Sequence, residues 1–155
     1  MNVRKAIGGS SHSSLSVVLV GTQFVLIALI ALTGPLWPAN WSLRGILMIG
    51  GVIGVWSLQV IGMRNLHVFP EIPKNGRLVV QGPYRWVRHP MYTAVLLVTA
   101  AWVLGTPLPY RMGLWMGLLV TLLIKLLYEE RLLLARFPTY KNYQIRTKRL
   151  IPFVW

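Results

Sequence analysis

The sequence predicts an all-α integral membrane protein with about four transmembrane helices, built as a single domain over residues 1–155. The chain is 55% hydrophobic and only 12% charged, about half the charged fraction that is usual in soluble domains. Its apolar residues gather into four runs, each close to the length that crosses the hydrocarbon of a bilayer. Basic residues outnumber acidic ones by 16 to 3 and concentrate in alternate loops, as the positive-inside rule predicts.

The four runs predict membrane spans that follow a short polar tail at residues 1–14, at about 15–37, 45–63, 91–106 and 113–128. The first run is too long for the apolar core of a signal peptide and lacks a small-residue cleavage site, so we expect an uncleaved anchor. In the second run, Gly50, Gly51 and Gly54 present a face of small residues that lets helices approach closely. That face permits a homodimer as well as a monomer.

The last two runs predict a short helical hairpin. Each holds about 16 residues, or about 24 Å of helix, and GTPLPYRMG between them predicts a tight turn. The helix should continue briefly after residue 128 and break at Pro138, where the sequence becomes basic and aromatic.

The distribution of charge predicts the topology. With four spans, the N-terminus, the loop 64–90 and the segment 129–155 lie on one side, which holds these basic residues: Arg4, Lys5, Arg64, Lys74, Arg77, Arg85, Arg88, Arg131, Arg136, Lys141, Arg146, Lys148 and Arg149. The other side holds Arg44 and Arg111. We therefore expect cytoplasmic termini in a membrane such as a prokaryotic inner membrane. The apolar composition argues against the interpretation that these basic residues bind nucleic acid.

One motif stands where the loop meets the third span. GPYRWVRHPMY, residues 82–92, combines two arginines, a histidine and three aromatic residues just before an apolar run. In an antiparallel hairpin the start of one helix neighbours the end of the next. Arg88, His89 and Tyr92 should therefore lie near Glu129 and Glu130, two of the three acidic residues in the chain. Carboxylates at a helix C-terminus oppose the helix dipole, so they need a compensating role.

These residue types suit a zwitterionic ligand that carries a flat ring. Pro90 fits the first turn of a helix, whose free N–H groups attract an anion. Arg88 can hold a carboxylate, and Glu129 or Glu130 can pair with an ammonium group. S-adenosylmethionine has these features, and a protein that uses it needs only to orient the reactants and exclude water. The chain has no cysteine, which excludes disulfides, thiolate metal sites and a cysteine nucleophile.

Residues 64–155 resemble the isoprenylcysteine carboxyl methyltransferase family and its prokaryotic relatives, which are similar here to phospholipid N-methyltransferases. The resemblance rests on GPYRWVRHPMY, an apolar hairpin, and then YEERLLLARFPTYKNYQIRTKRLIPFVW. It implies a methyltransferase that uses S-adenosylmethionine, releases S-adenosylhomocysteine and closes a cytoplasmic cofactor pocket with loop 64–90 and the C-terminal segment. The chain departs from the family pattern at Ala94, where glycine is common.

The resemblance also implies roles for individual residues. The cofactor would be bound by Leu78, Val79, Gly82, Pro83 and Tyr84 around the adenosine, by His89, Pro90 and Tyr92 at the amino acid end, by Glu129 at the ammonium group, and by Tyr140, Tyr143, Arg146 and Arg149 from the cytosol. Arg88 and Glu130 are the candidate catalytic residues, with Arg88 facing the acceptor's carboxylate. Either glutamate could hold the cofactor.

The expected acceptor is a lipophilic molecule or lipid that enters from the bilayer, and a carboxylate giving a methyl ester is the first choice. A phospholipid amine is the alternative acceptor. An NADPH-dependent sterol-type reductase and a non-enzymatic membrane subunit that binds lipids are further alternatives. Lys125, one turn before Glu129, is expected either to pair with that glutamate or to extend toward the membrane surface.

Overall fold

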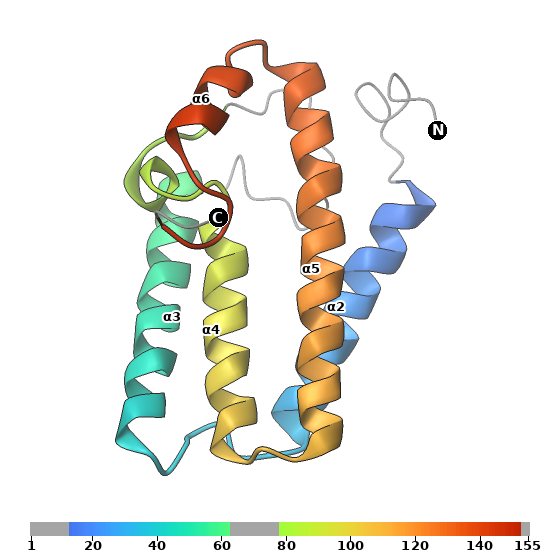
Figure 1. Ribbon diagram of the computed structural model, residues 1–155, viewed down its shortest axis with the longest axis vertical. Helices are drawn as coiled ribbons and strands as arrows, with labels where there is room; N and C mark the ends of the chain where they lie inside the picture. Colours follow the sequence, from blue (N-terminus) through green and yellow to red (C-terminus); the bar gives the residue numbers. More distant parts are fainter. Residues whose placement is uncertain (1–12, 63–77, 153–155) are drawn as a thin grey trace.

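The computed structural model describes residues 13–62 and 78–152. Four long helices run between two ends of the molecule: α2 (Ser14–Leu32), α3 (Trp41–Ile61), α4 (Pro90–Gly105) and α5 (Pro109–Arg136). A 3-10 helix, η1 (Gly82–Arg85), and a short helix, α6 (Tyr140–Arg146), lie together at one end, over α3 and α4 (Figure 1). We call this end the motif end and the opposite end the far end.

Three of the helices are long and apolar enough to cross a membrane: α2, α3 and α5. The fourth, α4, is apolar but has only 16 residues. The predicted all-α class and the membrane character of the chain are therefore supported, while the predicted number of spans stays a prediction.

Local signals in the sequence set the helix boundaries. The side chains of Ser13 and Asn40 accept hydrogen bonds from backbone N–H groups at the starts of α2 and α3. Pro90 and Pro109 occupy the first positions of α4 and α5, where a missing N–H costs nothing. Helix α5 ends at Arg136, two residues before Pro138, as the break at that proline predicted.

The helix boundaries differ from the predicted spans in three places. The first helix ends at Leu32, because Gly34 and Pro35 begin the turn that follows. The second begins at Trp41, earlier than predicted, because Asn40 caps it. The fourth covers 28 residues, so the last two helices do not form a hairpin of two short arms.

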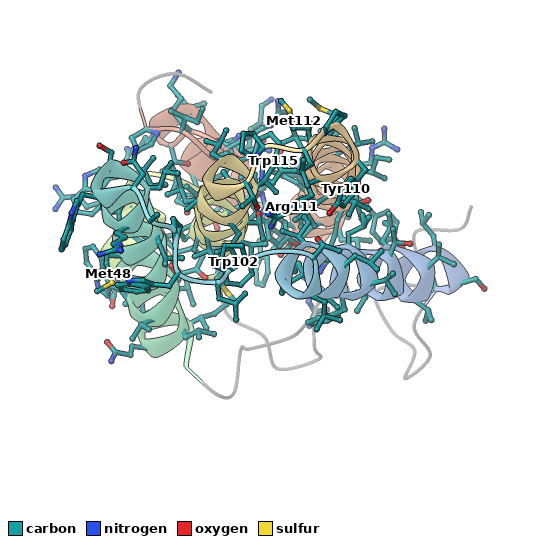
Figure 2. The ribbon with its side chains drawn as sticks, turned by 90° about the horizontal axis from the view of Figure 1, so that it is seen from below. Met48, Trp102, Tyr110, Arg111, Met112 and Trp115 are labelled. Carbon is teal, nitrogen blue, oxygen red and sulfur yellow. The ribbon has the colours of Figure 1, made fainter. Side chains whose placement is uncertain are left out.

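The helices pack in two pairs. Helix α4 makes most of its contacts with α3, and α5 makes most of its contacts with α2, which runs obliquely to the others (Figures 1 and 2). A β-carbon added at Gly50 would touch Leu97 and Val98 of α4, and one at Gly54 would lie 3.4 Å from the Ala94 β-carbon. Glycines on α3 thus provide the close approach that the departure at Ala94 had put in question.

The far end is closed by a buried arginine. Arg111 falls in the predicted turn GTPLPYRMG, but α5 begins at Pro109 and the side chain of Arg111 is fully buried. It donates to the carbonyl oxygens of Ile30, at 3.1 Å, and Thr106, at 3.3 Å. Figure 2 shows Arg111 between the helices, seen from the far end. These contacts satisfy carbonyls at the ends of α2 and α4 that have no partner within their own helices.

Replacing Gly34 with alanine should destabilise the fold, because a β-carbon there would collide with the guanidinium of Arg111. Overpacking of this kind costs about 1–3 kcal/mol. Thermal unfolding in detergent should therefore show a lower midpoint than wild type. Gly51→Ala is the matched control, since no atom lies within 4 Å of an added β-carbon. An unchanged midpoint for Gly34→Ala would show that Arg111 does not hold this end.

Candidate functional site

Three segments that are distant in the sequence meet at the motif end. They are the motif residues before α4, the final turns of α5, and the segment 140–150 that includes α6. The structure brings Arg88, His89 and Tyr92 into contact with Glu129 and Glu130, as the hairpin geometry predicted.

Arg88 joins all three segments. Its Nε donates to Oε1 of Glu130 at 2.6 Å, and the two side chains are only 8% and 5% exposed. Its NH1 donates to the carbonyl oxygen of Gln144 at 3.1 Å and to that of Thr147. These carbonyls belong to the last turn of α6, so the guanidinium also caps that helix.

The C-terminal segment pairs with the motif through backbone hydrogen bonds. Val87 and Lys148 form a parallel β-bridge. The backbone N–H groups of Arg88 and His89 donate to the carbonyls of Lys148 and Arg149, at 2.7 and 3.1 Å. Thr93 on α4 donates its hydroxyl to the Leu150 carbonyl. The segment is therefore fixed by backbone geometry as well as by Arg88.

The two glutamates have different surroundings. Glu130 is buried, and its second oxygen accepts from Nε of Arg149 at 3.2 Å, so both oxygens are engaged by arginines. Glu129 is 29% exposed in its side chain and accepts from the Tyr92 hydroxyl at 2.8 Å through Oε2. Among the described residues, Oε1 of Glu129 receives no hydrogen bond. Glu129 is thus the carboxylate that can take up a further cation.

His89 lies between the two carboxylates. Its Nδ1 is 3.7 Å from Glu129 and its Nε2 is 3.6 Å from Glu130, while its ring stacks on Tyr92 with centroids 5.3 Å apart. Within the described chain, Nε2 of His89 and the hydroxyl of Tyr140 are buried without a hydrogen-bond partner. Buried polar atoms normally have partners, so two such atoms beside the same carboxylate pair indicate a place for a polar ligand.

Three tyrosines outside the long helices enclose this cluster. Burial is the main cause that raises the pKa of Tyr84, Tyr140 and Tyr143 above the ordinary value for tyrosine. Glu129 raises the pKa of Tyr84 further, and Glu130 and Glu129 raise that of Tyr140. Their hydroxyls therefore stay protonated near neutral pH and are able to donate hydrogen bonds. The Tyr143 hydroxyl donates to the Tyr84 carbonyl at 2.5 Å, which links α6 to η1.

The remaining predicted residues lie around this cluster. Gly82 begins η1 with φ +57°, and a β-carbon there would lie 2.7 Å from Val60 of α3, so glycine is required at this position. Leu78 and Val79 are half-buried in the extended segment before η1. Pro83 and Pro90 are buried, and Arg146 is exposed at the end of α6. Glu71 and His67 lie outside the described residues.

Sequence reasoning missed several of the contacts. The backbone carbonyls of Gln144 and Thr147, which receive Arg88, leave no signal in the sequence. Gln23 on α2 accepts from Lys125 on α5 at 2.8 Å, and both side chains are buried. Gln23 could have predicted this contact, because a polar side chain inside an apolar run needs a hydrogen-bond partner from another helix.

A family model described as phospholipid methyltransferase matches residues 43–139. This range holds α3, the motif, α4 and α5, and it is well over half of the chain. The chain belongs to the phospholipid methyltransferase family. With three helices able to cross a membrane, it is a membrane protein of a methyltransferase family.

One curated relative is the cobalt-zinc-cadmium resistance protein CzcN of Cupriavidus metallidurans. It is 30% identical over an alignment of 122 residues, and the match covers 75% of this chain and 53% of that protein. The chain thus spans about half the length of this relative.

Breaking the pair of Arg88 and Glu130 should be costly, because it leaves a charge in a buried site. We expect Arg88→Met and Glu130→Gln each to lower the free energy of unfolding by about 3 kcal/mol. The double variant should lose less than the sum, since neither partner is then left alone. Denaturant unfolding in micelles measures these values.

Arg131→Met is the control for this cycle, because Arg131 lies next to Glu130 but is exposed. Its unfolding free energy should match that of wild type. Additive losses in the double variant would contradict a direct interaction between Arg88 and Glu130.

Proposed function

We propose that the chain is an integral membrane methyltransferase that uses S-adenosylmethionine and acts on a lipophilic acceptor, first of all a carboxylate. Membership of the phospholipid methyltransferase family supports the reaction class. The acceptor would reach the site from the bilayer, and both termini would face the cytoplasm. The working form is a monomer or a homodimer surrounded by membrane lipids.

The observation that carries this proposal is that the two glutamates have different contacts and different exposure. Glu130 is neutralised by Arg88 and Arg149, whereas Glu129 is partly exposed and is held by Tyr92. A carboxylate that is fixed in place but still accessible suits the ammonium group of an amino acid. We therefore assign the cofactor's ammonium group to Glu129.

The polar atoms near Glu129 fit the rest of an amino acid head group. Tyr140 offers a buried hydroxyl that has no hydrogen-bond partner in the described chain, and Nε2 of His89, also without a hydrogen bond there, faces Glu130 at 3.6 Å. Tyr84 and Tyr143 add apolar rings beside them, as an adenosine would require. The cofactor supplies a methyl group carried on a sulfonium, and the protein's part is to orient it and exclude water.

We propose a different role for Arg88 and Glu130 from the one that the resemblance implied. Their charged groups are engaged with each other, with Arg149 and with the carbonyls of α6. We therefore propose that both are positioning residues, which hold the segment 147–150 over the cofactor. His89 orients Glu129 by lying between the two carboxylates.

A phospholipid amine is the second candidate acceptor, and the description of the matching family favours keeping it. The two acceptors leave different products. A carboxylate yields a methyl ester and no proton has to leave, whereas an amine yields a methylamine and must release a proton. Alkali releases methanol from a methyl ester but not from a methylamine. A reaction with S-adenosylmethionine labelled in its methyl group therefore distinguishes the two products.

Calorimetric titration of the purified protein with S-adenosylhomocysteine tests the cofactor site. We expect micromolar binding by wild type. Glu129→Gln should weaken it about tenfold to a hundredfold, because a hydrogen bond between charged groups is replaced by a weaker one. Tyr92→Phe should weaken it less, since it removes only the group that orients Glu129.

Arg131→Gln is the matched control, with an exposed charge two residues along the same helix. It should bind S-adenosylhomocysteine as wild type does. Equal affinities for wild type and Glu129→Gln would remove the assignment of Glu129. Binding of NADPH, with no binding of S-adenosylhomocysteine by folded protein, would favour a reductase instead.

A further inference from the structure

Arg44 is a cation at the far end that has no carboxylate beside it. It lies in the first turn of α3 and is half-buried. Arg111 is the other cation that the sequence places at this end, and its side chain is fully buried. In the part of the chain that the structure describes, the carboxylates are those of Glu129 and Glu130, near the motif end of α5. An ionic partner for Arg44 would therefore have to come from outside these residues.

Two tryptophans flank the guanidinium of Arg44. Its Cζ lies 4.4 Å from the ring centroid of Trp41 and 5.5 Å from that of Trp37, and the two residues are 79% and 57% exposed. The Nε of Arg44 donates to the Pro38 carbonyl at 2.7 Å. Within residues 13–62 and 78–152, its two Nη atoms and both indole N–H groups have no hydrogen-bond acceptor. We call Trp37, Trp41 and Arg44 the Trp–Arg cluster.

The loop that carries the Trp–Arg cluster is fixed against α4. Pro38 is fully buried, and a β-carbon added at Gly105 of α4 would lie 3.3 Å from its β-carbon. The indole N–H of Trp102, also on α4, donates to the Leu36 carbonyl at 2.8 Å. The donors of the cluster are thus held in place before any ligand binds, which lowers the entropy lost on binding.

The length of α3 indicates the depth of the cluster in a bilayer. The helix has 21 residues and is about 31 Å long, which matches the hydrocarbon thickness of about 30 Å. Its first turn would therefore lie where hydrocarbon meets the head groups, a level that tryptophan prefers. Side chains on a helix tilt toward its N-terminus, and Arg44 reaches back to Pro38, so the guanidinium extends toward the head groups. The anion that a membrane offers at this level is the phosphate of a phospholipid.

We propose that the Trp–Arg cluster binds the phosphate of an anionic phospholipid in the leaflet at the far end. A guanidinium presents paired N–H donors that match phosphate oxygens, and the two indoles add donors beside it. The described residues at this end include no carboxylate to hold the ammonium group of a zwitterionic lipid. The expected partner is therefore a lipid such as phosphatidylglycerol, whose head group carries no ammonium. This inference does not depend on the proposed methyltransferase function.

The test is native mass spectrometry of the full chain released from detergent micelles and titrated with dioleoylphosphatidylglycerol. Dioleoylphosphatidylcholine has the same acyl chains and is the reference lipid. The dissociation constant of the first bound lipid is measured for each. Basic residues at the motif end also attract anionic lipid, so Arg131→Gln, at an exposed arginine there, is the control. Thermal unfolding without added lipid shows that each variant is folded.

We expect wild type to bind phosphatidylglycerol about tenfold more tightly than phosphatidylcholine. Arg44→Gln should weaken binding of phosphatidylglycerol about tenfold to a hundredfold, because hydrogen bonds between charged groups are lost. Arg44→Lys should keep part of the affinity, since it keeps the charge but not the paired donors. Trp41→Leu should weaken binding about threefold to tenfold, because it removes one neutral donor. Arg131→Gln should bind the first lipid as wild type does.

Trp102→Phe separates lipid binding from support of the loop. It removes the hydrogen bond to the Leu36 carbonyl but leaves the Trp–Arg cluster intact. If Arg44 acted only by fixing the loop, Trp102→Phe would weaken lipid binding as severely as Arg44→Gln, and the proposal would be overturned. Retained binding of phosphatidylglycerol by Trp102→Phe supports direct contact with the phosphate.

Four other results would also overturn the proposal. The first two are equal affinities of wild type for the two lipids and an unchanged affinity in Arg44→Gln. The third is an equal loss in Arg131→Gln, which would mean that the lipid binds at the motif end. The fourth is displacement of the lipid by glycerol 1-phosphate at a similar concentration, which would make a free phosphate ester the ligand.

Discussion

The candidate site depends on one buried ion pair, between Arg88 and Glu130. Burying two charges costs more than their attraction returns unless every hydrogen-bonding position is used. Here Arg88 also donates to two carbonyls of α6, and the second oxygen of Glu130 accepts from Arg149. The pair is therefore well satisfied, and it fixes the end of α5, the start of α4 and the C-terminal segment relative to one another.

This constraint decides which glutamate remains available. Neighbouring residues on a helix point about 100° apart, so Glu129 and Glu130 lie on different sides of His89. Because Glu130 is turned toward Arg88, Glu129 is turned toward Tyr92 and remains partly exposed. The same helix face carries Lys125 one turn deeper, so α5 contacts both the hydroxyl and the ring of Tyr92. Helix α5 thus supplies both carboxylates and the lysine around Tyr92.

The sequence predicted much of this arrangement. Apolar runs predicted the helical class, and proline positions predicted the start of α4 and the end of α5. The antiparallel order of the last two helices was enough to place His89 and Tyr92 near the glutamates. The start of α5 was predicted four residues too late, because GTPLPYRMG was interpreted as a turn, whereas Pro109 occupies the first position of the helix.

The contacts of Arg88 and Arg111 could not be predicted in the same way. Both arginines donate to backbone carbonyls at helix ends, and every residue type presents that acceptor. Only the packed positions of the helices decide which carbonyl is in reach. For the same reason the sequence assigned Arg88 to a substrate, whereas the structure engages it within the protein.

Hydrogen exchange measured by mass spectrometry tests the central claim, that Arg88 holds the C-terminal segment on the motif before any ligand binds. The amides of Arg88, His89 and Lys148 all donate across this contact. In wild type without ligand, peptides covering 86–89 and 147–150 should exchange slowly. In Arg88→Met both should exchange much faster, while peptides from the paired helices α3 and α4 should not change. Fast exchange in wild type, or unchanged exchange in Arg88→Met, would contradict the account.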